Sequence, residues 1–130
     1  MNKKIKMITF DLDDTLWDNR PTIIKAEIDT RKWIEDKVGK VEWGDFSDFL
    51  ELREELIKED ESIAWDISKL RKEIFRKKLS HVNPIKLRNE IVESAFDIFI
   101  SKSHEIVFFD GVEEFISDLS KKYLLLILTN

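Results

Sequence analysis

Two short apolar runs lie near the two ends of the chain. The first stops abruptly at Asp11 and the second at Thr129. Such runs predict two parallel strands, over 5–11 and 123–129, that are covered on both faces and carry functional groups at their carboxyl ends. A buried helical turn is the alternative for the second run, which is rich in leucine.

Between these runs, apolar residues recur at helical spacing. The predicted helices cover 21–39, 45–58, 62–79, 84–100 and 112–121. In the first of them, which Pro21 opens, four residues share one apolar stripe. These are Ile24, Ile28, Ile34 and Val38. The order of the elements predicts an α/β fold, in which a partial core of two parallel strands carries a large helical insertion.

Composition and charge narrow the class of protein. The 130 residues carry a net charge of −5, and 42% of them are hydrophobic, which is enough to build a core. An acidic block at 41–62 and a basic block at 69–88 nearly cancel. Apolar residues at helical spacing run through the basic block, so its charges predict the wet face of a helix, with the acidic helix as its neighbour. No apolar run approaches the roughly 20 residues of a membrane span. We therefore expect neither nucleic acid nor a membrane as partner.

The absence of cysteine from the sequence excludes disulfides, thiolate catalysis and cysteine-ligated metal sites. The basic start of the chain is similar to the opening of a signal peptide, but Asp11, Asp13 and Asp14 interrupt the apolar stretch too early. These observations predict a cytoplasmic protein.

Candidate chemistry concentrates where the first predicted strand ends. Asp11 and Asp13 stand two positions apart there and are followed by Thr15. If the chain curls, the two carboxylates converge, and a close pair either shares a proton or is neutralised by a metal. A hard cation such as Mg²⁺ suits a site built from oxygen. Aspartates that cap a helix in a solvated turn are an alternative that the two acids alone leave equally open.

The segment 10–16, Phe-Asp-Leu-Asp-Asp-Thr-Leu, resembles the first motif of the haloacid-dehalogenase-like hydrolase superfamily. In that motif an apolar strand ends in Asp, any residue, Asp, any residue, Thr. Residues 128–130 are similar to the second motif, and 108–112 resemble the segment that leads from the cap back to the core. The implied division is a core at 1–18 and 105–130 with a helical cap of the first type at 19–104.

The resemblance also implies a role for each motif residue. Asp11 would take the phosphoryl group as nucleophile, and Asp13 would protonate the leaving alcohol and then activate water. Mg²⁺ would bind the Asp11 side chain and the Asp13 backbone carbonyl, while Thr129 and Asn130 would hold the phosphate. Dehalogenase members lack the second aspartate, so Asp13 favours phosphate chemistry. We expect a Mg²⁺-dependent phosphatase of a small phosphorylated metabolite, closest over 11–21 to phosphatases of flavin mononucleotide and related riboflavin intermediates.

One departure from the family's pattern concerns the sequence after the second motif. Family members continue to a lysine that holds the phosphate and to an acidic pair that completes the metal site, and this sequence stops at Asn130 before either. We therefore expect the N-terminal part of a larger enzyme, with little or no turnover alone. The alternatives are a truncated non-catalytic product and a helical interaction module without chemistry. Trp17, just beyond the first motif, either lines the entrance to the site or packs.

Overall fold

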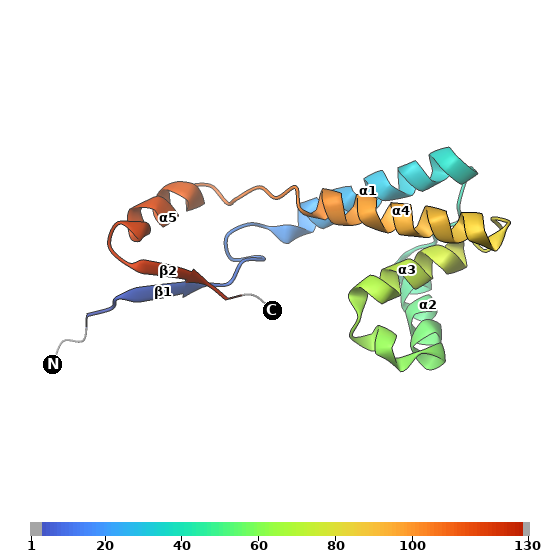
Figure 1. Cartoon of the computed structure of the whole chain (residues 1–130), viewed down its shortest axis with the longest axis horizontal. Helices are drawn as coiled ribbons and strands as arrows, with labels where there is room; N and C mark the ends of the chain where they lie inside the picture. Colours follow the sequence, from blue (N-terminus) through green and yellow to red (C-terminus); the bar gives the residue numbers. More distant parts are fainter. Residues whose placement is uncertain (1–3, 129–130) are drawn as a thin grey trace. The chain divides into compact units, whose positions relative to one another are not determined.

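The computed structural model describes residues 4–128. Within this range the chain forms two short strands, five α-helices and one 3₁₀ helix (Figure 1). In chain order these are β1 (Met7–Phe10), α1 (Asn19–Val38), α2 (Phe46–Glu59), η1 (Glu61–Ala64), α3 (Ile67–Lys78), α4 (Ile85–Ser103), α5 (Val112–Ser120) and β2 (Leu124–Ile127). The predicted α/β class, with two parallel strands and a helical insertion between them, is confirmed.

The described residues divide into two compact units. The first lies within Met1–Lys25 and Lys102–Asn130, and the second is Ala26–Ser101. None of the helices described between residues 4 and 128 combines the length and the apolar character needed to cross a membrane.

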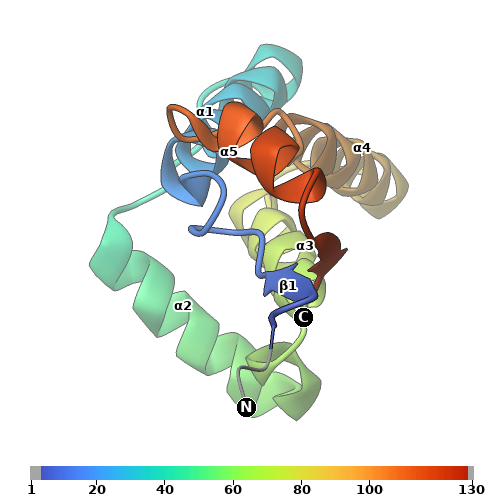
Figure 2. The ribbon, with the colours of Figure 1, turned by 90° about the vertical axis from the view of Figure 1, so that its left-hand side faces the viewer.

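The first unit is built on a two-stranded parallel sheet. β1 pairs with β2 from Met7 opposite Leu124 to Phe10 opposite Ile127, and the strands lie side by side in both views (Figure 1, Figure 2). The Leu128 N–H donates to the Phe10 carbonyl at 2.8 Å, which extends the pairing just past β2. α5 precedes β2 and contacts it. The leucine-rich run is therefore a strand, and the helical alternative for it is wrong.

Both strands are shorter and more exposed than the sequence predicts. Met7 is 49% exposed, Leu124 61% and Ile127 62%, so the described residues do not cover the apolar strands on both faces. The physical reason is that, within residues 4–128, α5 is the one helix in contact with the sheet. The apolar runs predicted that strands form, but not how much of each strand is covered.

The second unit is a helical body with two hydrophobic clusters. The larger cluster includes Phe75 of α3, Leu79 directly after α3, and Val92 and Ala95 of α4, each at most 1% exposed. Trp43 meets Phe75 edge to face, with the ring centroids 6.3 Å apart. The smaller cluster joins α2, η1 and α3 through Leu56, Ile63 and Leu70. Removing these apolar surfaces from water is the main force that holds the helices together.

The buried face of α1 differs from the predicted stripe. Ile34 is fully buried as expected, but Ile24 and Ile28 are 52% and 60% exposed. Ala26 and Thr30 are buried instead. They lie eight and four residues before Ile34, so the three residues share one face of the helix. Small side chains allow neighbouring elements to approach a helix axis closely. The face of α1 that carries the smaller side chains is therefore the buried one, although the face with Ile24 and Ile28 is more hydrophobic.

α2 begins where the sequence predicts because Asp45 caps it. The Asp48 N–H donates to the Asp45 carboxylate at 3.0 Å, and the Asp45 N–H donates to the Asp48 carboxylate at 2.7 Å. This reciprocal capping box satisfies N–H groups that the first helical turn leaves without partners. The hydrogen bond from the Asp48 backbone, followed by that from Ser47, lowers the pKa of Asp45.

The single helix predicted over 62–79 is wrong, because the structure divides this stretch into η1 and α3. α3 begins at Ile67, and the Asp66 carboxylate caps it by accepting from the Lys69 N–H at 2.9 Å. The apolar spacing of the sequence does not reveal this break. Ile67 stands at the helical interval expected of a buried residue, although it is 75% exposed. A local cap therefore decided where the helix starts.

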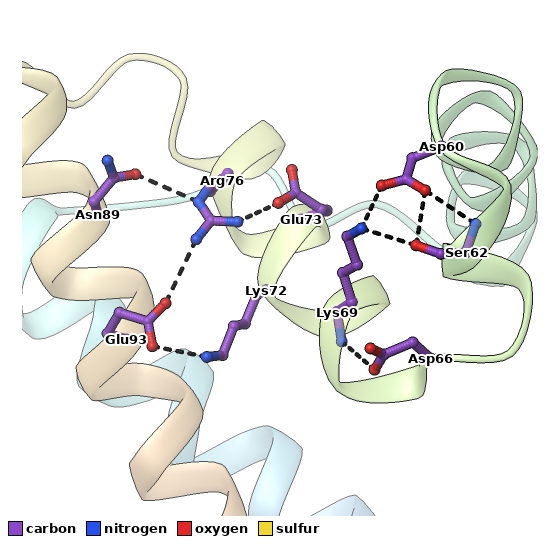
Figure 3. A network of polar contacts seen from close by, with 9 residues as sticks. All are labelled: Asp60, Ser62, Asp66, Lys69, Lys72, Glu73, Arg76, Asn89 and Glu93. Carbon is purple, nitrogen blue, oxygen red and sulfur yellow. Dashed lines mark hydrogen bonds and ion pairs between the residues drawn. The ribbon is translucent and has the colours of Figure 1, made fainter.

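On one side, α3 is tied to η1 through Lys69 (Figure 3). The Lys69 ammonium pairs with the Asp60 carboxylate and donates to the Ser62 hydroxyl at 2.8 Å. Asp60 also accepts from the Ser62 N–H at 3.0 Å. The hydrogen bond from Lys69, with those from Ser62, lowers the pKa of Asp60 to about 2.

On the other side, α3 is tied to α4 through Glu93 (Figure 3). The Glu93 carboxylate pairs with Lys72 at 2.8 Å and with Arg76 at 3.5 Å. Lys77 of α3 reaches Glu59 of α2 at 3.1 Å. The basic block thus forms the wet face of an amphipathic helix, with the acidic helix as its neighbour, as predicted.

Candidate active site

The two predicted catalytic residues lie directly after β1, in residues 11–16, which we call the acidic loop. Asp11 and Asp13 are both exposed. Because β1 and β2 are parallel, the carboxyl end of β2 lies beside the start of this loop, as the hydrogen bond from Leu128 to Phe10 shows. In open parallel sheets, ligands bind at this edge.

The acidic loop folds back in a tight turn. The Leu12 carbonyl accepts from the Thr15 N–H at 3.1 Å and from the following N–H at 3.0 Å. Asp14 has a φ of 60°, a left-handed conformation that aspartate adopts more readily than most residues. After the turn, the backbone of Trp17 pairs with that of Asp13. The turn therefore brings the backbone of Trp17 back beside that of Asp13, the candidate acid and base.

Two further aspartates cap the start of α1. The Asp14 carboxylate accepts from the Asn19 N–H at 3.0 Å, and the Asp18 carboxylate accepts from the Arg20 N–H at 3.1 Å. Pro21 has no N–H that needs a partner. Asp14 and Asp18 are therefore helix caps, a distinction from Asp11 and Asp13 that the sequence did not reveal.

Asp11 and Asp13 take no part in this capping. Among the described residues, neither side chain has a hydrogen bond or an ion pair. Both carboxylates are exposed, so the described part of the chain leaves them open to a ligand. Two exposed carboxylates in one short turn offer oxygen ligands to a cation.

Trp17 joins the acidic loop to residues 104–111, which we call the return segment because they lead from α4 to α5. The backbone of Trp17 pairs with that of Phe108 in antiparallel fashion, and the Leu16 carbonyl accepts from the Phe109 N–H at 3.0 Å. The rings of Trp17 and Phe108 meet edge to face, with their centroids 5.8 Å apart. Trp17 therefore packs on a residue far along the chain, which no local pattern could indicate.

The donors of the acidic loop suit Mg²⁺ in chemical type. Asp11 and Asp13 offer carboxylate and carbonyl oxygens, and Mg²⁺ takes one or two carboxylates while it retains several waters. No group of three His, Cys, Asp or Glu side chains that could hold a metal occurs between residues 4 and 128. The predicted phosphate ligands Thr129 and Asn130 lie outside the described residues. The Asp11 carboxylate and the Asp13 carbonyl are therefore oxygen donors of the type that Mg²⁺ binds.

No protein-family model and no curated protein matches this sequence. Solved structures do match it. A 2-haloacid dehalogenase from Pseudomonas syringae pv. Tomato is 30% identical, with a TM-score of 0.75, over 97% of this chain and 55% of the dehalogenase.

Two further structures are similar in fold. One is YfnB from Bacillus subtilis, described as a HAD-hydrolase bound to magnesium, with 20% identity and a TM-score of 0.55 over 98% of this chain and 55% of that protein. The other is a haloacid-dehalogenase-like family hydrolase from Xanthomonas campestris, with 16% identity and a TM-score of 0.52 over 98% of this chain and 52% of that protein.

The chain thus spans about half the length of the solved structures that it matches. The structures from Bacillus subtilis and Xanthomonas campestris show the fold alone, whereas the structure from Pseudomonas syringae is also similar in sequence. The chain has the fold of a partial haloacid-dehalogenase-like core with a helical insertion, and it is similar in sequence as well as in fold to part of a 2-haloacid dehalogenase.

Proposed function

We propose that the chain carries the nucleophile and the acid–base residue of a Mg²⁺-dependent phosphatase that acts on a small phosphorylated metabolite. One observation carries the proposal. Asp11 and Asp13 are exposed at the carboxyl end of β1, and neither side chain is engaged by another described residue. The neighbouring aspartates, Asp14 and Asp18, are used as caps instead.

In this proposal, an Asp11 carboxylate oxygen attacks the phosphorus and forms an aspartyl phosphate. The ester oxygen leaves with the proton that Asp13 donates. Water then attacks the aspartyl phosphate while Asp13 takes up a proton, so that phosphate and the free Asp11 carboxylate are released. Asp13 lies in the same turn as Asp11, so the same residue can donate a proton in the first step and accept one in the second.

Electrostatics explains why this chemistry needs a cation. A carboxylate that approaches a phosphate faces a repulsion of about 4 kcal/mol per pair of unit charges at roughly 4 Å and an effective dielectric near 20. When bound, Mg²⁺ would offset this charge and polarise the phosphoryl oxygens. The Asp11 side chain and the Asp13 carbonyl would hold it. The magnesium-bound structure of YfnB supports this choice of metal.

We further propose that turnover needs groups beyond those described here. Thr129 and Asn130 would bind the phosphate, and a lysine and an acidic pair from further sequence would complete the site. Two observations support this. The chain spans about half the length of its structural neighbours, and apolar residues of both strands are exposed, including Met7 and Leu126 at 49% and 44%.

Hydrolytic dehalogenation is a second candidate, because the structure with 30% identity is a 2-haloacid dehalogenase. In that reaction Asp11 would displace a halide from carbon and form an ester, which water would then cleave. Asp13 argues against it, since this chemistry has no alcohol to protonate. We therefore rank phosphate transfer first.

One assay separates the two reactions. Phosphate release from a panel of phosphate monoesters that includes flavin mononucleotide is compared with halide release from 2-chloropropionate, with Mg²⁺ and with a chelator. The assay uses the 130-residue chain and the same chain extended by the residues encoded downstream. We expect Mg²⁺-dependent phosphate release from the extended chain, with little from the shorter one.

Variants then assign the residues. Asp11→Asn and Asp13→Asn should each abolish phosphate release, while Asp18→Asn, an exposed neighbour that can still cap α1, should not. Halide release without phosphate release would refute the phosphatase and favour the dehalogenase. Equal turnover by the two chain lengths would refute the need for further residues.

A further inference from the structure

We propose that Trp17 is the positioning residue that holds the acidic loop in its active conformation, by joining it to the return segment. The inference rests on the proposed function and adds to it a residue that the family motif does not include. Trp17 is half-buried, whereas Asp11, Asp13 and Thr15 are exposed. The loop residues that would do the chemistry therefore need support from a neighbour.

The backbone of Trp17 reaches in two directions. It forms a parallel bridge with Asp13 and an antiparallel bridge with Phe108. Next to it, the Leu16 carbonyl accepts from the Phe109 N–H at 3.0 Å. Trp17 is thus the residue through which the candidate acid and base, Asp13, is connected to the return segment.

The Trp17 ring adds a side-chain contact to the backbone pairing. It meets Phe108 at a centroid distance of 5.8 Å and an interplanar angle of 67°, the edge-to-face geometry that aromatic pairs favour. Phe108 in turn lines a hollow of about 640 Å³ formed by the return segment and the first turn of α5. Phe108 therefore contacts the Trp17 ring and also lines this hollow.

The indole N–H does not explain this arrangement. Trp17 Nε1 is shielded from solvent and has no hydrogen-bond partner among the described residues. A buried donor without a partner is unfavourable, so apolar packing of the ring must hold Trp17 in place. Phenylalanine, which keeps an aromatic ring and lacks the N–H, should therefore support the loop as well as tryptophan does.

Positioning matters because this chemistry tolerates little displacement. A shift of about 1 Å in a reacting group can cost on the order of a hundredfold in rate. Loss of the ring contact weakens the link between the acidic loop and the return segment, and leaves the loop held by the pairing of β1 with β2 and by the Asp14 cap of α1. We expect Asp11 and Asp13 to remain exposed but to lose their fixed arrangement.

The test compares Trp17→Ala, Trp17→Phe and, as a matched control, Phe115→Ala. Phe115 is an exposed aromatic of α5 in the same unit. The first readout is the amide exchange of Leu16 and Phe109 by NMR. The second is the affinity of the chain, extended by the residues encoded downstream, for trifluoroberyllate with Mg²⁺, a mimic of an aspartyl phosphate.

Trp17→Ala should speed exchange at both amides and weaken trifluoroberyllate binding by about tenfold, at the upper end of what loss of an aromatic pair produces. Trp17→Phe and Phe115→Ala should stay within about twofold of the parent chain, a change well below that of a lost aromatic pair. If Trp17→Ala does not fold, Phe108→Leu removes the same ring contact from the other side and should give the same pattern.

Unchanged exchange and affinity in Trp17→Ala would overturn the proposal. A loss in Trp17→Phe equal to that in Trp17→Ala would also overturn it, because the N–H and not the ring would then be responsible. Failure of the chain extended by the residues encoded downstream to bind trifluoroberyllate would refute the proposed function instead. In that case the exchange measurement still decides whether Trp17 anchors the loop.

Discussion

Replacement of Phe75 by leucine tests what holds α3 in the second unit. Phe75 is 1% exposed and meets Trp43 edge to face at 6.3 Å. Leucine lacks three of its side-chain carbons, and each buried carbon contributes about 0.8 kcal/mol. We therefore expect Phe75→Leu to lower the free energy of unfolding by about 2–3 kcal/mol, part of which comes from the lost ring pair.

Glu93→Gln is the matched perturbation of the charged network (Figure 3). It removes the ion pairs that Glu93 makes with Lys72 at 2.8 Å and with Arg76 at 3.5 Å. The Glu93 side chain is 52% exposed, so solvent screens both pairs. Exposed pairs contribute about 0–1 kcal/mol each, and we expect the total loss to stay below about 1 kcal/mol.

The assay is urea unfolding followed by helical circular dichroism. Both variants should keep the denaturant slope of the parent chain, so that the shift in midpoint measures stability. If Glu93→Gln lowers the free energy of unfolding as much as Phe75→Leu does, the surface network and not the apolar cluster holds α3. A neutral effect of Phe75→Leu would equally contradict the role of the apolar cluster.

Three further changes have defined outcomes. Gly44→Ala should lower the melting temperature, with a loss of about 1 kcal/mol or more, because Gly44 has a φ of 75° and an added Cβ would lie 2.8 Å from Asp48 Cβ; an unchanged melt would contradict this. Thr30→Val should raise the free energy of unfolding, measured in urea, by about 1 kcal/mol, because the Thr30 hydroxyl is buried without a partner among the described residues; a loss of stability would show that the hydroxyl is satisfied. The pKa of Asp60 is lowered from 3.8 to about 2 by Lys69, so its contribution to stability is present above about pH 4 and is lost as the pH falls toward 2. Urea midpoints measured across this pH window should therefore fall less in Asp60→Asn than in the parent chain, and parallel curves would contradict the assignment.

Local signals predicted most of the helices. α2 begins at its cap, Asp45, and the apolar spacing of α4 places Ile91, Val92 and Ala95 in the core. The errors arise where contacts between distant parts of the chain decide. Ile24 is exposed because packing selected the face of α1 that carries the smaller side chains.

The candidate site was predictable in position but not in detail. The end of an apolar run located Asp11 and Asp13, since a strand that stops at acids exposes them at the edge of a sheet. Which aspartates cap α1 depends on backbone geometry, because the left-handed turn at Asp14 brings its carboxylate to the Asn19 N–H. The partner of Trp17 comes from the other end of the helical insertion, where sequence spacing gives no signal.

The central claim is that Asp11 accepts a phosphoryl group beside Mg²⁺. The most direct measurement is amide NMR of the chain, extended by the residues encoded downstream, with Mg²⁺ and trifluoroberyllate. We predict that shifts concentrate in the acidic loop and at Trp17, disappear in Asp11→Asn and persist in Asp18→Asn. Shifts that collect on the acidic helix α2 instead, or that survive Asp11→Asn unchanged, would contradict the claim.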